Sequence, residues 1–138
     1  MNFAAACYWL CRAGLCLAYA YSGVAKLFDF HGAMAEQAHF GLSPPALFAI
    51  LTIAVQLGGS ALILCARGRY ATLGAVALAG FTLAATFVGH PFWGETGMQR
   101  FADLNAFLEH FGLIGGFLLI ALIETGRIAS PSAVAERI

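Results

Sequence analysis

The sequence predicts an all-α protein: a transmembrane four-helix bundle with both termini on the cytoplasmic side. Of its 138 residues, 61% are hydrophobic and only 10% are charged. Four apolar runs are long enough to cross a bilayer, and most basic residues outside them fall on one side. Only helices and closed barrels satisfy the backbone hydrogen bonds of a chain in lipid, and these runs lack the alternating pattern of barrel strands.

The composition places the chain among membrane proteins. A soluble domain is about half apolar and about a quarter charged, whereas the mean hydropathy of this chain is +0.82. Seven basic and seven acidic residues cancel. Because a nucleic-acid partner calls for a basic surface, this balance predicts no nucleic acid as a partner and leaves membrane lipid as the expected surroundings.

The apolar runs cover roughly residues 3–28, 45–65, 70–89 and 104–123. Each is near the roughly 20 residues that a helix needs to cross a hydrocarbon core of about 30 Å. No Lys or Arg precedes the first run and Arg12 interrupts it, so we expect it to remain as a span rather than to be cleaved as a signal peptide.

Basic residues set the expected orientation. Four spans put both termini on one side of the membrane, together with the turn Arg67-Gly68-Arg69, Arg127 and Arg137. The opposite side holds Arg100, with Lys26 at the edge of the first span. Because Lys and Arg are enriched in cytoplasmic segments, we expect a multi-pass protein of the bacterial cytoplasmic (inner) membrane with its two longer loops in the periplasm.

Arg12 lies inside the first span, where charge is costly. At about 1.5 Å per residue it is roughly 13 Å from the cytoplasmic end of the helix, and a central Arg costs about 2.5–3.5 kcal/mol on insertion scales. Gln56 is the only strongly polar side chain deep in the second span. We therefore expect Arg12 and Gln56 to form an intramembrane polar pair, either as a structural pin or as part of a ligand site.

A second polar group is expected near the periplasmic ends of the spans. Its candidate ligand-binding residues are Lys26, His90, Trp93, Glu109 and His110. Lys26 and Glu109 lie at similar depth and could form an ion pair, while the His side chains can exchange protons near neutral pH. No two of these residues have a recognised metal-ligand spacing, so no metal site is predicted, and no catalytic residue is assigned.

Glycines on the fourth span favour close helix contacts. Gly112 and Gly116 form a GxxxG pattern, which lets two helix backbones approach each other in lipid. We expect these contacts to form within the bundle, with a homo-oligomer contact as the alternative.

The order of short motifs resembles the DoxX/DoxD-like family of small four-helix membrane proteins. The family pattern has an early Arg, a Ser-Gly-x-x-Lys-Leu, a Pro turn, Gly-Gly on the second helix, a basic turn, a His-x-Phe-Trp and a late Gly-Gly. The matching positions are Arg12, Ser22-Gly23-Val24-Ala25-Lys26-Leu27, Gly41-Leu42-Ser43-Pro44, Gln56-Leu57-Gly58-Gly59, Arg67-Gly68-Arg69, His90-Pro91-Phe92-Trp93 and Gly115-Gly116. The resemblance implies a single DoxX-like transmembrane domain over residues 1–138.

Two positions depart from the family pattern. Gln56 stands where the family has an acidic residue, and Glu109-His110 stands where it has Lys-Asn. The first change turns an Arg–carboxylate pair into an Arg–amide pair. The second reverses a charge, which a Lys26–Glu109 pair could neutralise.

The family is named for a membrane subunit linked to thiosulfate:quinone oxidoreductases. The resemblance therefore implies an accessory or quinone-interacting subunit of a redox or oxidative-stress system, working beside a redox partner subunit. At most the chain would be a membrane subunit of a quinone-linked oxidoreductase, with a quinone as its only expected cofactor. The alternative is a non-catalytic membrane scaffold, a lipid-binding protein or a small transporter-like bundle.

Overall fold

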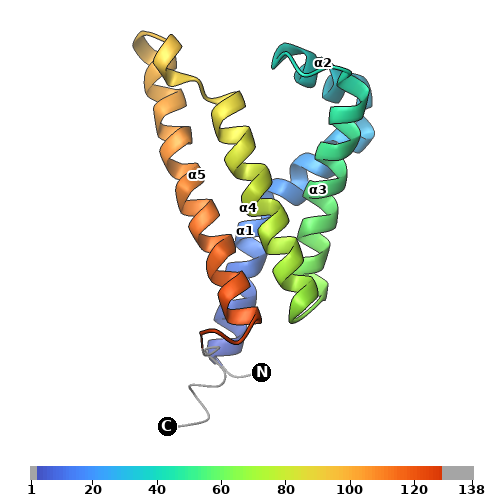
Figure 1. The fold of residues 1–138 in the computed structure, drawn as a ribbon, viewed down its shortest axis with the longest axis vertical. Coiled ribbons are helices and arrows are strands. Elements are labelled where there is room, and N and C mark those ends of the chain that lie inside the picture. Colours follow the sequence, from blue (N-terminus) through green and yellow to red (C-terminus); the bar gives the residue numbers. More distant parts are fainter. Residues whose placement is uncertain (1–2, 129–138) are drawn as a thin grey trace.

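The computed structural model describes residues 3–128 and is helical throughout (Figure 1). Arg137, which contributed to the expected orientation, lies outside the described residues. The elements are α1 (Phe3–Phe28), α2 (Phe30–His39), α3 (Pro45–Cys65), α4 (Arg69–Gly89), the short 3-10 helix η1 (Phe92–Gly94) and α5 (Gly97–Glu124). The described part contains no strand, so the all-α prediction is confirmed.

Helices α1, α3, α4 and α5 are long and apolar enough to cross a membrane, which confirms four spans. The bounds of α1 and α3 coincide with the expected runs 3–28 and 45–65. Helix α5 starts earlier than the expected 104, because residues 97–103, which include the polar Gln99, Arg100 and Asp103, continue the same helix beyond its apolar part. Apolar runs alone therefore underestimate the length of a helix that continues into a more polar segment.

Helix α2 was not expected, since its loop is short and has no long apolar run. Asp29 begins it: the Oδ1 atom accepts a hydrogen bond of 2.8 Å from the Gly32 backbone N–H. A carboxylate in this position satisfies one of the N–H groups that a helix leaves unpaired at its start. Helix α2 brings Glu36 and Gln37 over the ends of the spans.

The bundle has two different ends (Figure 1). We call the end with the start of α1, the end of α5 and the α3–α4 turn the terminus end, and the end with α2 and η1 the loop end. The four long helices converge toward the terminus end. At the loop end α3 and α4 diverge, and α1 runs obliquely behind them toward α2 and α3, away from α5.

Glycine allows α3 and α4 to approach closely. A Cβ added at Gly74 would lie 2.7 Å from the backbone oxygen of Gly59, and one added at Gly59 would lie 2.7 Å from the Leu78 side chain. Gly116 likewise faces the Leu15 side chain of α1, whereas a Cβ added at Gly112 would meet nothing within 4 Å. Half of the GxxxG pattern therefore packs within the bundle, and the other half faces outward.

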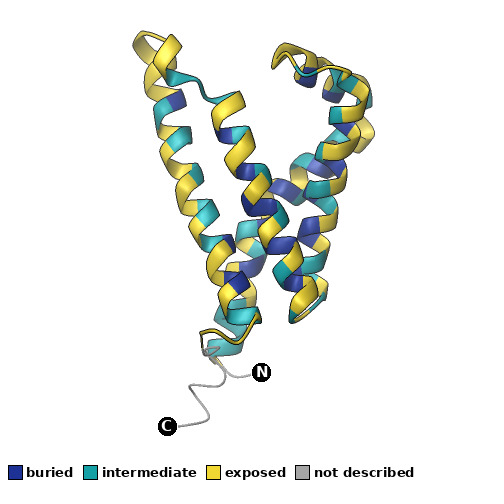
Figure 2. Ribbon diagram, in the orientation of Figure 1, coloured by how far each residue is buried: buried dark blue, intermediate teal, exposed yellow. Residues whose placement is uncertain are grey.

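Buried positions gather where the long helices converge, while α2 and the outer faces are largely exposed (Figure 2). The core of buried apolar side chains includes Cys16, Ile63, Leu78 and Phe117, from all four long helices. Outward-facing apolar side chains fit a bundle surrounded by lipid, where van der Waals packing through small residues holds helices together.

Candidate functional site

The divergence of α3 and α4 leaves a pocket of about 810 Å³ toward the loop end, which we call the main pocket. Its wall comes from α1, α2, α3 and α4, with two residues from α5. Most of its lining is aliphatic or aromatic, and the aromatic side chains are Tyr19, Phe40, Phe48 and Phe81. The volume and the apolar lining are those of a site for a small organic molecule.

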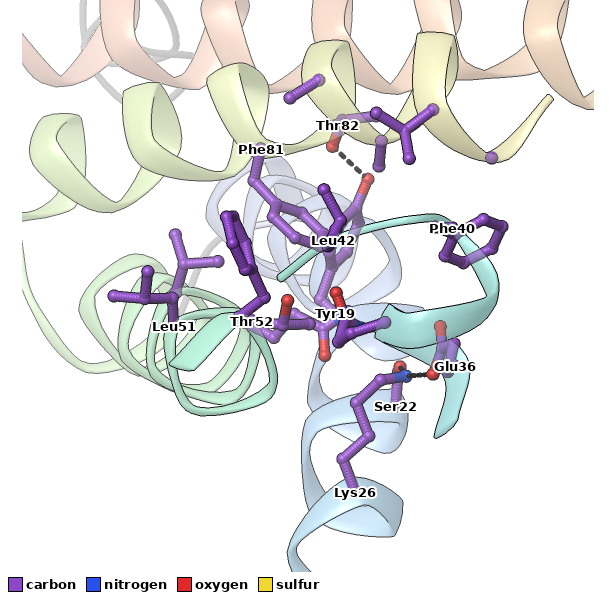
Figure 3. Close-up of a pocket in the computed structure, with 18 of the residues that line it drawn as sticks. Tyr19, Ser22, Lys26, Glu36, Phe40, Leu42, Leu51, Thr52, Phe81 and Thr82 are labelled. Atoms are coloured by element: carbon purple, nitrogen blue, oxygen red, sulfur yellow. Dashed lines mark hydrogen bonds and ion pairs between the residues drawn. The ribbon is translucent and has the colours of Figure 1, made fainter. Parts of the chain in front are cut away.

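One polar group on the wall is the ion pair between Lys26 and Glu36. The Lys26 Nζ lies 2.8 Å from Glu36 Oε2 and donates a 3.0 Å hydrogen bond to Ser22 Oγ. Figure 3 shows the three side chains together on one side of the pocket. The expected Lys26–Glu109 pair is therefore wrong, because α2 supplies the carboxylate at an end where α1 and α5 diverge.

A second polar group lies deeper, between α1, α3 and α4. The hydroxyl groups of Tyr19 and Thr82 lie 2.5 Å apart, and both residues line the pocket (Figure 3). Gln56 lines it too; its side chain is only 6% exposed, and its Oε1 has no hydrogen-bond partner in the described part of the chain. An unpaired buried acceptor is costly, so a ligand or water that donates to it would be stabilised.

The third polar group is a histidine pair on α4 and α5. His90 and His110 both line the pocket, with ring centroids 5.0 Å apart and the rings edge to face. The Nδ1 of His110 lies 2.9 Å from Thr86 Oγ1, and the Nδ1 of His90 lies 3.3 Å from Asp103 Oδ1. The structure thus brings together two histidines that are 20 residues apart in the sequence.

Trp93 and Glu109, the other two candidate residues, do not line the pocket. Trp93 is 59% exposed on η1, where its ring contacts those of Phe92 and Phe107 edge to face. Glu109 is exposed on α5. Lys26, His90 and His110 are therefore the candidate residues that share one pocket.

Arg12 does not pair with Gln56, contrary to the expected intramembrane pair. Its Nη1 lies 3.1 Å from Glu124 Oε1, and its Nη2 donates a 2.8 Å hydrogen bond to the Ala66 carbonyl. The physical reason is charge: a carboxylate neutralises a buried guanidinium, which an amide cannot do. Gln56 is left facing the pocket, and its Oε1 has no hydrogen-bond partner among residues 3–128.

Glu124 was missed because it directly follows the last apolar run and was treated as its boundary. It is the final residue of α5, and its side chain is 7% exposed. Four groups hold it: Arg12, Tyr8 Oη at 3.0 Å, Arg67 Nη1 at 3.4 Å and the Gly68 backbone N–H at 2.7 Å. One carboxylate therefore ties α1, the α3–α4 turn and α5 together, and we call this set the Glu124 cluster.

No three side chains of the kinds that bind metals come together in residues 3–128. What the main pocket offers is an apolar volume with donors and acceptors at three places: the Lys26–Glu36 pair, the Tyr19–Thr82–Gln56 region and the histidine pair. Such a pocket can hold a ring or chain of apolar atoms while hydrogen-bonding to a few oxygens.

Comparisons with known proteins support the family. The family model described as DoxX matches residues 8–91. The chain is 28% identical over 120 residues to the inner membrane protein YphA of Escherichia coli, an alignment that covers 87% of this chain and 84% of that protein. No solved structure gives a significant match. With four apolar helices, these matches identify a multi-pass protein of the inner membrane, as the sequence predicted.

Proposed function

This chain belongs to the DoxX family, and we propose that it binds a quinone in the main pocket as an accessory subunit of a redox system in the membrane. The observation that carries the proposal is the pocket itself: about 810 Å³, mostly apolar, with four aromatic side chains and a few polar groups. A quinone needs the same combination, because it has a flat apolar ring, an apolar tail and two carbonyl oxygens.

The polar groups suit the oxygens of such a ring. Lys26 Nζ is a donor, His110 lines the wall between α4 and α5, and Gln56 has an unpaired acceptor. A carbonyl oxygen would accept from the first, and a hydroxyl of the reduced form would donate to the last. A redox partner subunit would exchange the electrons, in keeping with the quinone-linked role for which the family is named.

We place the loop end, and with it the pocket, on the periplasmic side. Arg67, Arg69 and Arg127 lie at the terminus end, while the loop end holds Arg100 and the paired Lys26. A membrane-impermeant maleimide tests this placement in intact cells. It should label a Glu95→Cys variant from outside and leave native Cys65, near the terminus end, unlabelled.

Photolabelling with an azido-substituted ubiquinone tests the site. The label should attach to peptides of α3 and α4 that line the pocket, and excess decylubiquinone should prevent it. Ala85→Phe fills the pocket and should abolish the labelling that decylubiquinone prevents. Ala54→Phe lies on the exposed face of α3 and should leave this labelling unchanged. Equal labelling of both variants, or labelling of lipid-facing segments alone, would contradict a quinone site and favour a scaffold.

A further inference from the structure

We propose that His90 and Asp103 form a proton-transfer link between the main pocket and a second pocket at the loop end. The second pocket, which we call the vestibule, has a volume of about 300 Å³ and includes His39, Glu95, Gln99 and Asp103 in its lining. Only the identity of the proton donor in the main pocket rests on the proposed function. The link itself rests on the arrangement of the side chains.

The two pockets share an apolar wall. Phe40, Val88 and Gly89 line both of them, and none of these residues has a side chain that can carry a proton. His90 lines the main pocket and Asp103 lines the vestibule. Their contact, 3.3 Å from Nδ1 to Oδ1, is therefore a polar connection that bypasses the apolar wall.

The hydrogen bonds of His90 and His110 determine which ring nitrogen of each can accept a proton. A carboxylate only accepts, so the Nδ1 of His90 carries the proton toward Asp103, and Nε2 of neutral His90 is left as the acceptor. Thr86 Oγ1 donates its one proton to the Thr82 carbonyl, at 2.6 Å, so Nδ1 of His110 must donate to Thr86. Nε2 of neutral His110 is therefore also free to accept.

The proton balance then follows. A hydroxyl in the main pocket gives its proton to His90 Nε2, while the proton on Nδ1 passes to the Asp103 carboxylate. Asp103 releases that proton to water in the vestibule, and water-mediated transfer of the remaining ring proton from Nε2 to Nδ1 restores the starting tautomer. No electron moves in this step, and the hydroxyl is left as its conjugate base.

The other charged groups near the His90–Asp103 link either pair with each other or form no hydrogen bond or ion pair with His90. Lys26 and Glu36 pair with each other on the wall of the main pocket. Gln99 Nε2 donates a 3.0 Å hydrogen bond to Asp103 Oδ2, which leaves Oδ1 for His90. His39 and Glu95 line the vestibule, and Glu109 follows on α5 beside His110. Glu95 is thus a control carboxylate in the same pocket as Asp103, and it forms no hydrogen bond or ion pair with His90.

The test measures how fast the ring proton of His90 exchanges with water, by NMR of the full chain in lipid nanodiscs with ¹⁵N-labelled histidine and no added quinone. Asp103→Asn keeps the acceptor for His90 but cannot hold a proton. It should slow the exchange roughly 100-fold, the lower range of what a positioned acid–base group contributes. Glu95→Gln should leave the exchange unchanged, and equal rates in Asp103→Asn and the unmodified protein would overturn the link.

A second variant guards against misfolding of the first. Asp103→Glu keeps an ionisable carboxylate, so the His90 ring proton should exchange faster than in Asp103→Asn, and equally slow exchange in both variants would contradict the link. Decylubiquinol binding is measured separately on the same samples. If exchange depends on Asp103 but decylubiquinol does not bind, the link stands and the proposed ligand is wrong; binding with Asp103-independent exchange refutes the link alone.

Discussion

At the terminus end, the Glu124 carboxylate is held by four groups and its side chain is 7% exposed, whereas at the loop end the Glu36 carboxylate is held by Lys26 and its side chain is 43% exposed. The first carboxylate joins three parts of the bundle. The second lies on the wall of a pocket that α3 and α4 leave between them. Charge within one small membrane protein thus serves packing at one end and leaves polar atoms available to a ligand at the other.

Glu124→Leu should have the largest effect on stability. It leaves Arg12 buried without a counter-charge, and loss of one partner of a buried ion pair costs about 3–5 kcal/mol. The free energy of unfolding, measured by denaturant titration in detergent micelles, should fall by that amount. Glu109→Gln, an exposed position on the same helix, should change it by less than about 0.5 kcal/mol. Equal losses would show that the Glu124 cluster does not hold the bundle.

A double-mutant cycle sharpens the assignment of the partner of Arg12. Arg12→Leu combined with Glu124→Leu should cost less than the sum of the single variants, with a coupling of about 0.5–3 kcal/mol. Arg12→Leu combined with Gln56→Leu should be additive, because the two side chains form no hydrogen bond with each other. Additivity in the first cycle with coupling in the second would restore the Arg12–Gln56 pair.

Disrupting the close α3–α4 contact should have an intermediate effect on stability. Gly74→Ala should lower the free energy of unfolding by about 1–3 kcal/mol, because the added methyl group would clash with the Gly59 backbone oxygen. On the same helix, a Cβ at Gly80 meets nothing within 4 Å. Gly80→Ala should therefore be neutral or stabilising, since alanine favours helix over glycine by up to about 1 kcal/mol. Thermal melts of both variants check the difference in sign.

Lys26→Met should have the smallest effect on stability. The Lys26–Glu36 pair is partly exposed, and such pairs contribute about 0–1 kcal/mol. The melting temperature should thus change little, while photolabelling by the azido-ubiquinone should weaken because a donor to the ring oxygen is lost. A large loss of stability with unchanged labelling would show that Lys26 stabilises the bundle and does not contact the ligand.

The apolar runs predicted the spans because lipid solvation acts on whole segments, and a segment of about 20 apolar residues is visible without knowing its neighbours. Helix α2 was invisible by that criterion, since its signal is the single capping residue Asp29. The missed cap also explains the wrong partner for Lys26. Glu36 reaches Lys26 only because α2 folds over the ends of α1 and α3.

The histidine pair could be proposed from the sequence because both residues lie near the same ends of adjacent spans. The Arg12–Glu124 pair could not, since depth alone suggested Gln56, and an oblique α1 changes which residues meet. Glu124 has one sequence signal in hindsight: it is an acid at the same end as Arg12 and the Arg67-Gly68-Arg69 turn. Charge complementarity across the terminus end would have found it.

The most direct test of the proposal that the main pocket binds a quinone is native mass spectrometry of the protein released from its own membrane in mild detergent. We expect a retained mass of an isoprenoid quinone at one copy per chain, and its loss in Ala85→Phe but not in Ala54→Phe. A chain that carries only phospholipid, equally in all three proteins, would contradict a quinone site and leave the main pocket as a lipid-filled gap between diverging helices.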